Sequence, residues 1–387
     1  MIADTRTWLK RLTRSGAAGL LAILAACAQQ PGNTAATQSS VLSPSTPGWR
    51  ITRLLPDLAV GGLWAGGPRD AWLAGDECAD PATCGESDTS NGTLVVRHWD
   101  GVSWRAVKPQ KAYTNTPLDQ GAGPVTGTSA ANVWIAAYRG TESADWTDML
   151  HWTGRRWAAP VRLPSPIQAV IAPSATQLWA FGDGTKPGQP GYVAHFTGKS
   201  WRSGVFPLAG TTAAALSPAD IWVGGITAGG RPGMEHWNGR EWQATPFPDL
   251  APDSPGFSEV AVQGIAAVKP DDVWADVGDI GSDSSNGQGA FLMHWNGRAW
   301  AWTHFPYTGL AYSPVTTDGH DGLWLVLAAK DKKSWFCHYS AGRWTRTPVP
   351  SSSLPQLLAW IPGTNSQWAI GAASDFGAGT AILKYGT

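Results

Sequence analysis

Residues 294–300 read His-Trp-Asn-Gly-Arg-Ala-Trp, and the tripeptide Asp272-Val273-Trp274 ends twenty residues before His294. Both pieces recur along the chain. The heptad H-W-x-G-x-x-W, with some variation in its second place and in the position of its glycine, opens at six histidines: His98, His151, His195, His236, His294 and His338. The shorter piece ends in tryptophan at seven places: Trp72, Trp134, Trp179, Trp222, Trp274, Trp324 and Trp368. Self-similarity at a spacing of roughly 40–60 residues indicates a repeat protein whose units bury apolar faces against one another.

A seventh heptad is divided between the chain ends. Lys384-Tyr385-Gly386-Thr387 supplies its first half, and Pro47-Gly48-Trp49 supplies its second half. We therefore expect a strand near the N-terminus to complete the sheet that the C-terminal strands begin. Such pairing leaves no sheet edge open.

One repeat, residues 258–305, shows how a unit folds. It contains four apolar runs, separated by polar turns: 260–267, 273–275, 291–295 and 300–302. Asn296-Gly297 predicts a two-residue hairpin turn, because such turns require positive φ. Four strands per repeat and seven repeats predict an all-β fold. This fold is a seven-bladed β-propeller of four-stranded antiparallel blades over residues 48–387, closed by pairing of the N- and C-terminal strands.

The repeats resemble a broad group of bacterial propeller repeats with D-V-W and H-W-x-G-x-x-W signatures, and they are loosely similar to kelch, Asp-box and WD repeats. The sequence departs from the Asp-box pattern, which places Ser-x-Asp-x-Gly before its tryptophan. It also departs from the tryptophan-docking pattern of quinoprotein propellers. No catalytic residue is therefore carried over from either group.

The N-terminus has the features of a targeting segment. Basic residues precede a short apolar run, Gly16 to Ala26, which is too short to span a bilayer. Leu24-Ala25-Ala26-Cys27 resembles the lipobox of bacterial lipoproteins, and this resemblance implies a signal peptide over 1–26 and a lipidated, palmitate-carrying Cys27. The alternative is an ordinary secretory signal cleaved near Ala26. Residues 27–47 are polar and read as a flexible tether, so we expect a membrane-anchored protein of the cell envelope.

Composition narrows the possible partners. The 387-residue chain is 43% hydrophobic with a formal net charge of −1, and it has no basic cluster of the kind that binds nucleic acid outside the N-terminal segment. Cys78 and Cys84 are close enough in sequence to predict a local disulfide in an oxidising compartment, with a metal site as the alternative. Cys337 falls within a strand and is expected to be buried. The sequence predicts no cofactor, no metal ligand set and a monomer.

The repeated histidines are best explained as hydrogen-bonded structural groups, and the repeated tryptophans as blade-to-blade packing. The long, variable segments should all emerge on one face of the propeller, where binding residues are expected. Exposed aromatic rings beside polar groups suit carbohydrate; the alternative is that these residues only anchor solvated turns. The candidate binding residues are Tyr138, Arg139, Trp146, Asp279, Asp283, His304, Tyr307, Tyr312, His320, Trp335 and Phe376.

The favoured function is a non-enzymatic, lipid-anchored module that binds a protein or a cell-envelope glycan through this face. The alternative is a glycan-active lyase or glycoside hydrolase, because propeller lyases use His, Tyr and Arg. Its non-repeat candidates are His304, Tyr307, Tyr312 and His320. A calcium site at Asp279 and Asp283 lacks the spacing of known calcium loops. A purely structural role in the envelope is not separable from the first hypothesis by sequence.

Overall fold

The protein is described here from a computed structural model. The structure describes residues 47–78, 92–114, 121–141, 144–184, 189–248, 250, 260–279, 290–305, 314–328, 334–350, 355–372 and 379–386. The predicted signal peptide, Cys27 and the predicted tether before Pro47 lie outside these residues, and so does Cys84. The lipid anchor and the Cys78–Cys84 disulfide therefore stay predictions.

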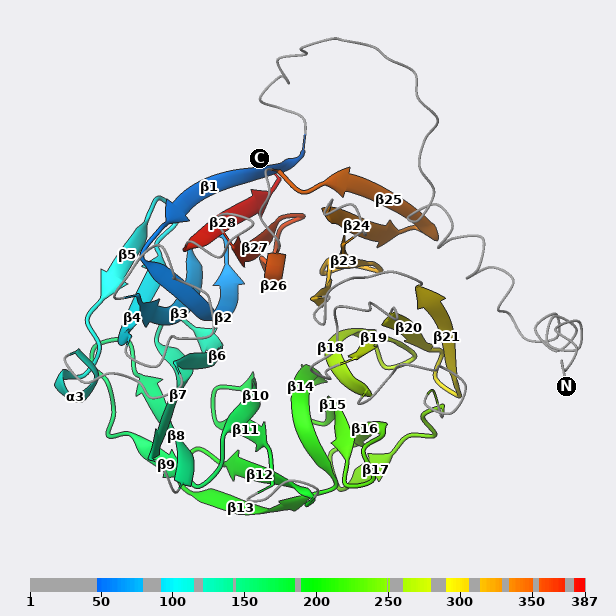
Figure 1. The fold of residues 1–387 in the computed structure, drawn as a ribbon, viewed down its shortest axis with the longest axis horizontal. Coiled ribbons are helices and arrows are strands. Elements are labelled where there is room, and N and C mark those ends of the chain that lie inside the picture. Colours follow the sequence, from blue (N-terminus) through cyan, green and yellow to red (C-terminus); the bar gives the residue numbers. More distant parts are fainter. Residues whose placement is uncertain are drawn as a thin grey trace, which may run out of the picture.

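The described strands form seven four-stranded antiparallel sheets arranged as a ring (Figure 1). This arrangement confirms the predicted seven-bladed β-propeller. In six blades the strands follow chain order from the centre outward. Blades 1 to 3 contain β2 (Leu58–Gly67), β3 (Asp70–Glu77), β4 (Thr93–Trp99) and β5 (Trp104–Val107); β6 (Ala122–Ser129), β7 (Asn132–Thr141), β8 (Ala144–Trp152) and β9 (Val161–Leu163); and β10 (Ile167–Ser174), β11 (Gln177–Gly182), β12 (Gly191–Phe196) and β13 (Trp201–Phe206). Blades 4 to 6 contain β14 (Leu208–Ser217), β15 (Asp220–Thr227), β16 (Pro232–Trp237) and β17 (Trp242–Ala244); β18 (Val260–Lys269), β19 (Asp272–Asp279), β20 (Ala290–Trp295) and β21 (Trp300–Phe305); and β22 (Val315–Thr317), β23 (Leu323–Ala328), β24 (Ser334–Ser340) and β25 (Arg343–Pro348).

Blade 7 joins the two ends of the chain. Its inner strands are β26 (Pro355–Trp360), β27 (Gln367–Ala372) and β28 (Thr380–Tyr385), and its outermost strand is β1 (Trp49–Leu55). Trp49 pairs with Tyr385 in the antiparallel register, so the predicted division of the seventh heptad is confirmed. Figure 1 shows β1 alongside β28 at the point where the ring closes. The closure satisfies the backbone groups that an open sheet edge would expose.

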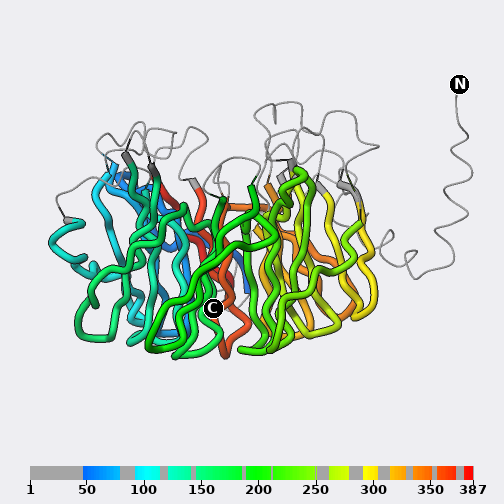
Figure 2. The backbone as a smooth tube through the Cα atoms, turned by 90° about the horizontal axis from the view of Figure 1, so that it is seen from below, coloured from blue at the N-terminus to red at the C-terminus, as the bar shows by residue number. Residues whose placement is uncertain are grey.

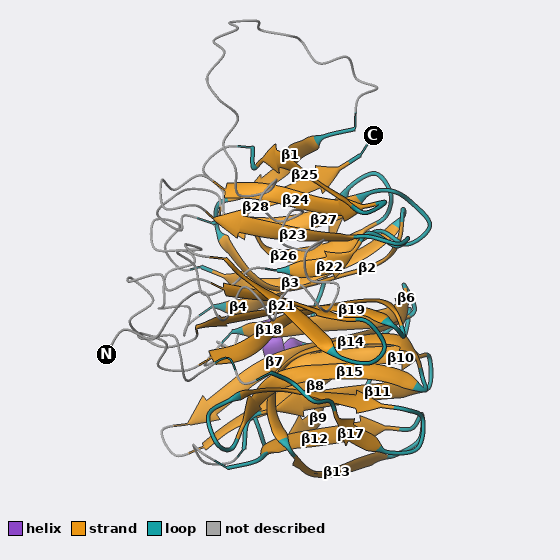
Figure 3. Cartoon of the chain, turned by 90° about the vertical axis from the view of Figure 1, so that its right-hand side faces the viewer, coloured by secondary structure: helices purple, strands orange, loops and turns teal. Residues whose placement is uncertain are grey.

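Helical structure is minor in the described part of the chain. Helix α3 (Lys111–Thr114) is a single turn between blades 1 and 2 (Figure 3). Among the described residues, no helix has the length and apolar character needed to cross a membrane.

The two faces of the ring differ in their connections. The turn face is formed by the first-to-second and third-to-fourth strand connections of the blades, and it makes the lower edge of the ring in Figure 2. These connections are mostly tight, as predicted, and all are described: 68–69, 130–131, 175–176, 218–219, 270–271, 318–322 and 361–366 between first and second strands, and 100–103, 153–160, 197–200, 238–241, 296–299 and 341–342 between third and fourth strands. The opposite face, where the second-to-third strand and blade-to-blade connections begin, is called the loop face.

The heptad turn differs from the predicted two-residue hairpin. Trp295 pairs with Trp300, so four residues form the turn. The side-chain oxygen of Asn296 accepts hydrogen bonds from the backbone N–H groups of Arg298 and Ala299, at 3.1 and 3.0 Å. This local side-chain bonding stabilises the longer turn. Gly297 does take the expected positive φ, 85°.

Aromatic side chains join each blade to the next. The tryptophan of the short motif on one blade meets aromatic residues of the heptad on the following blade. In blade 5, Trp274 lies 5.4 Å from Tyr339 and 6.4 Å from Trp344 of blade 6, the latter edge to face. The remaining junctions use Trp72–Trp152, Trp134–Trp201, Trp179–Trp242, Trp222–Trp300, Trp324–Trp49 and Trp368–Trp104. The predicted packing role of the repeat tryptophans is thereby confirmed for the whole ring.

Candidate functional site

Five of the six heptad histidines are hydrogen-bonded structural groups, as the sequence predicted. In blade 5 the ring of His294 stacks on Trp274 at 4.0 Å, and its Nε2 lies 2.9 Å from Oδ1 of Asp272. The same Oδ1 accepts a hydrogen bond from Nε1 of Trp274 at 2.7 Å. Burial raises the pKa of Asp272, but the bonds from His294 and Trp274 outweigh burial and leave its pKa below the ordinary value. One carboxylate thus fixes two aromatic rings.

The same arrangement recurs with substitutions. Blades 1 and 4 repeat it with Asp70 and Asp220. In blade 2 the acceptor is Asn132, 2.7 Å from His151, and burial lowers the pKa of His151 to about 4. In blade 6 the acceptor is Asp318, which approaches His338 from the preceding turn at 2.9 Å. Blade 3 departs most, because Nε2 of His195 and Nε1 of Trp179 are buried without partners.

Three candidate binding residues lie on blade 2, where they make internal contacts. Tyr138 connects two blades: its hydroxyl donates to the carbonyl of Ile167 on blade 3 at 2.6 Å. A Cβ at Gly123 would lie 2.6 Å from the Tyr138 hydroxyl oxygen, so a glycine is required beside it. Burial raises the pKa of Tyr138. These contacts assign Tyr138 to the junction between blades.

The other two belong to a cluster at the loop-face end of blade 2. This blade 2 cluster consists of Tyr113, Arg139, Trp146, Asp148 and Arg162. The Tyr113 hydroxyl donates to Oδ2 of Asp148 at 2.8 Å, and both Arg139 and Arg162 form ion pairs with Asp148, at 3.8 and 3.5 Å. Burial and the neighbouring Asp148 raise the pKa of Tyr113.

Each arginine of the blade 2 cluster also covers an aromatic ring. The guanidinium of Arg139 lies 4.9 Å from the Tyr113 ring centroid, and that of Arg162 lies 4.2 Å from the Trp146 centroid. The Arg139 side chain is 13% exposed, whereas that of Arg162 is 63% exposed. Arg162 is therefore a positioned cation on an aromatic base that remains open to solvent.

The remaining candidates are dispersed. Trp335, at the loop-face end of β24, lies under Arg346 at 4.6 Å. His320 lies in the 318–322 turn on the turn face, whereas position 304 falls at the loop-face end of β21, so the non-repeat histidines of the enzyme alternative are not brought together. Only the backbone is described at Asp279 and His304. Asp283, Tyr307, Tyr312 and Phe376 lie outside the described residues.

The structure also shows buried groups outside the set of candidate binding residues. Asp76, at the loop-face end of β3, is 4% exposed. Its Oδ2 accepts a hydrogen bond from the N–H of Ala122 at 2.8 Å, and its Oδ1 has no partner. Burial raises the pKa of Asp76 to about 7, against the lowering effect of the Ala122 bond. Cys337 is fully buried, as expected. No group of three or more His, Cys, Asp or Glu side chains suited to a metal is found within the described ranges.

The centre of the ring holds a cavity of about 480 Å³ lined by the first strands of all seven blades. Small and apolar side chains dominate its wall. Gln263 also lines the cavity, and it is long and polar. Both polar atoms of its amide are buried without a hydrogen-bond partner.

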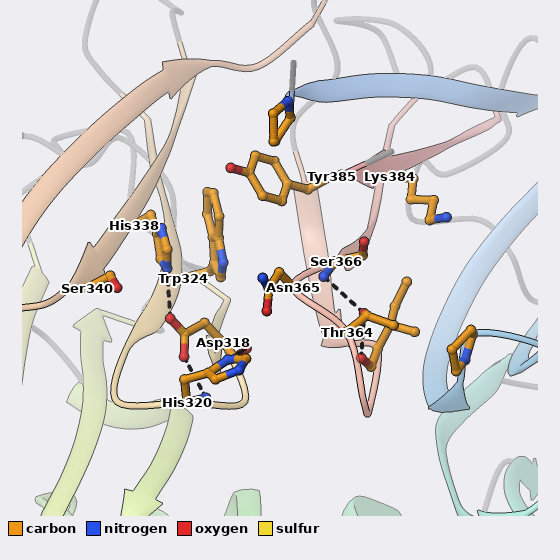
Figure 4. Close-up of a pocket in the computed structure, with 14 residues that line it drawn as sticks. Asp318, His320, Trp324, His338, Ser340, Thr364, Asn365, Ser366, Lys384 and Tyr385 are labelled. Atoms are coloured by element: carbon orange, nitrogen blue, oxygen red, sulfur yellow. Dashed lines mark hydrogen bonds and ion pairs between the residues drawn. The ribbon is translucent and has the colours of Figure 1, made fainter. Parts of the chain in front are cut away.

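A larger pocket, of about 830 Å³, lies on the turn face between blades 6 and 7 (Figure 4). Its wall on blade 6 includes Asp318, His320 and His338, and its wall on blade 7 includes the 364–366 turn, Lys384 and Tyr385. The sequence predicted binding on the other face and did not predict this pocket, although His320, one of the candidate residues, lies in its wall. One signal was available, because the divided heptad begins with Lys384 where the others begin with histidine.

Comparisons with known proteins agree on the architecture. No family model matches the chain, and no curated protein matches it. The structure of U3-55K aligns with a TM-score of 0.56 and 10% identity, covering 88% of this chain and 98% of that chain. The β-propeller domain of Myceliophteria thermophila Cps50 (Swd1) aligns with a TM-score of 0.56 and 10% identity, covering 87% of this chain and 99% of that chain.

A third solved structure, SapL1 lectin in complex with alpha methyl fucoside, aligns with a TM-score of 0.49 and 11% identity, covering 80% of this chain and 98% of that chain. The likenesses to U3-55K and to Cps50 show a shared β-propeller fold. Any function must be argued from the residues of this chain.

Proposed function

We propose that the protein is a lipid-anchored binding module of the cell envelope, which engages a protein or glycan partner through its loop face. The observation that carries this proposal is the blade 2 cluster. It holds two arginine–aromatic stacks in place with a buried carboxylate and leaves the Arg162 guanidinium exposed. Rigid aromatic and arginine side chains are the groups that dominate binding energy at recognition surfaces.

The topology supports an orientation for this module. The outermost strand β1 begins at Trp49, which pairs with Tyr385 at the turn-face end of β28. A tether that precedes Pro47 therefore joins the propeller at its turn face. If Cys27 carries the lipid, the tether attaches beside the turn face, and the loop face lies on the opposite side from the attachment point, where a partner has access.

Binding of the purified mature protein, kept in detergent, to a glycan array with product analysis would test the proposal. We expect ligand retention without bond cleavage, and we expect Arg162→Ala and Trp146→Ala each to weaken it about tenfold or more. Arg105→Ala is the matched control, since Arg105 is 70% exposed on blade 1 and, within the described part of the chain, forms its ion pair with Asp100 near the turn face.

Three outcomes are informative. Cleavage of a glycan would replace the binding module with an enzyme. Equal binding by the Arg162→Ala and wild-type proteins would remove the blade 2 cluster from the proposal. If no glycan binds, the same variants can be compared by cross-linking in intact envelopes, where loss of a cross-linked partner only in the Arg162 and Trp146 variants would identify a protein ligand.

A further inference from the structure

Blade 7 breaks the repeat at two neighbouring positions. In blade 5, His294 stands opposite Trp274 in the strand register, and Asp272 precedes Trp274 by two residues. In blade 7, Lys384 stands opposite Trp368, and Ser366 occupies the place of the aspartate. The hydrogen-bonded histidine–aspartate pair of blade 5 is thus replaced in blade 7 by a lysine and a serine.

Within the described part of the chain, the replacement leaves Lys384 without a carboxylate partner. The Lys384 ammonium lies 5.6 Å from the centroid of the Trp368 ring, and no ion pair joins it to a carboxylate among the described residues. The residue opposite Lys384 on β1 is another cation, Arg50. Burial and Arg50 both lower the pKa of Lys384. Like charges directly opposite each other on neighbouring strands are destabilising unless an anion compensates them.

Lys384 lines the 830 Å³ pocket of the turn face together with short polar side chains. Figure 4 shows Ser366 between Lys384 and Asn365, with Thr364 below and the Tyr385 ring above. Asp318, hydrogen-bonded to His338 at 2.9 Å, lies at the end of the pocket opposite Lys384. The hydroxyl of Ser366 and the amide of Asn365 are hydrogen-bond donors for an oxyanion, and the ammonium group supplies the compensating charge. The Thr364 hydroxyl already donates to the Ile361 carbonyl at 2.8 Å and accepts from the N–H of Ser366, so it shapes the turn. Every residue of this pocket wall is described.

We propose that the pocket between blades 6 and 7 binds an oxyanion, a carboxylate or phosphate group, through Lys384 and the 364–366 turn. Two sources carry this chemistry in a cell envelope: a phospholipid headgroup and an acidic saccharide. The site lies on the opposite face from the blade 2 cluster. It therefore stands or falls independently of the partner proposed for the loop face.

Calorimetric titration of the full mature protein with sn-glycerol 3-phosphate and with glucuronate tests the site, and glucose serves as the uncharged probe. Lys384→Met keeps a long apolar side chain over Trp368 and removes the charge. We expect binding of one or both anions by the wild type, and affinity at least about tenfold weaker in Lys384→Met. Equal affinity in both proteins, equal affinity for glucose and glucuronate, or no heat with either anion would overturn the proposal.

A second variant separates ligand loss from misfolding. Lys384→His with Ser366→Asp restores the pair that blade 5 uses, so it should fold at least as stably as the wild type while losing the anion. Retained anion binding by this double variant would also overturn the proposal. Sedimentation with phosphatidylglycerol vesicles, compared with phosphatidylcholine vesicles, then distinguishes the sources. Lys384-dependent binding to the anionic vesicles identifies a headgroup, and a preference for glucuronate over glycerol 3-phosphate identifies an acidic saccharide.

Discussion

Blades 5 and 3 are built on the same motif but satisfy its polar atoms differently. In blade 5, Asp272 accepts hydrogen bonds from Trp274 and His294. In blade 3 the corresponding residue is Gln177, and the ring nitrogens of Trp179 and His195 have no acceptor. The two stacks nevertheless have similar geometry, with centroid separations of 4.0 Å in blade 5 and 3.7 Å in blade 3.

The comparison separates packing from hydrogen bonding. Since the rings of blade 3 stack without an acceptor, the position of the tryptophan is set by its apolar contacts with the strands and with the next blade. The aspartate of blade 5 accepts hydrogen bonds from two buried donors that would otherwise lack a partner. Packing of the tryptophan ring should therefore contribute more to stability than the hydrogen bonds to the aspartate. Those hydrogen bonds should in turn contribute more than the neutral Gln177 does at the same position in blade 3.

The largest expected effect comes from removing the packing term. Trp274→Ala should lower the free energy of unfolding by about 3–5 kcal/mol, because the ring is 3% exposed and also contacts Tyr339 and Trp344 of blade 6. Chemical denaturation measures this loss. Trp302→Ala is the control on the same blade, since Trp302 is 46% exposed, and it should change stability by less than about 1 kcal/mol. Similar losses in the two variants would contradict the role of the inter-blade contacts.

The second effect comes from removing the acceptor. Asp272→Ala should lower the free energy of unfolding by about 1–3 kcal/mol, because it leaves two buried N–H donors unsatisfied. Gln177→Ala, the equivalent change in blade 3, removes no such bond and should change stability by less than about 0.5 kcal/mol. The pair is measured in the same denaturation experiment. Equal losses would mean that Asp272 acts through packing alone.

Much of the fold was predictable because its signal is repeated. Seven tryptophan motifs and six complete heptads give the number of blades, and the divided seventh heptad gives the closure through β1 and β28. The turn length was wrong, since Asn296 bonds to the backbone of its own turn through its side chain. Such local bonding depends on geometry that a hairpin pattern does not contain.

The candidate site was harder to predict because a side chain's neighbours come from distant segments. Tyr138 is an aromatic residue near a long loop in sequence, yet its hydroxyl is occupied by Ile167 of the next blade. Asp148 and Arg162 were not selected, although together they place the exposed guanidinium over Trp146. The anion site proposed on the turn face depends on Lys384, which stands where the other heptads have histidine. This difference could be interpreted only once the structure had shown what the repeated histidine does.

Asp76 presents the opposite case to blade 3. In blade 3 buried nitrogens lack an acceptor, whereas Asp76 is a buried acceptor with too few donors. Its pKa of about 7 lies above the ordinary 3.8, so the folded protein holds a proton that the unfolded chain has released between these values. Stability should therefore fall as pH rises from about 4 to about 7. Residue 76 does not titrate in Asp76→Asn. The free energy of unfolding of this variant should exceed that of the wild type by about 1–2 kcal/mol at pH 8, with little difference near pH 4. Denaturation at both pH values checks this, and a pH-independent difference would contradict it.

The smallest expected effect supplies the missing acceptor to blade 3. Gln177→Asp should stabilise the protein by about 0.5–1 kcal/mol, because the new carboxylate can accept bonds from Trp179 and His195. Burial and Arg202 now lower the pKa of His195, and a neighbouring carboxylate should raise it. The gain from this ion pair is fully present below the unfolded histidine value of about 6.5 and is lost as pH rises through the new folded pKa. NMR titration of His195 gives an independent readout. If the pKa of His195 does not rise in the variant, residue 177 cannot reach the ring nitrogen, and the difference between blades 3 and 5 arises from backbone geometry as well as from side-chain identity.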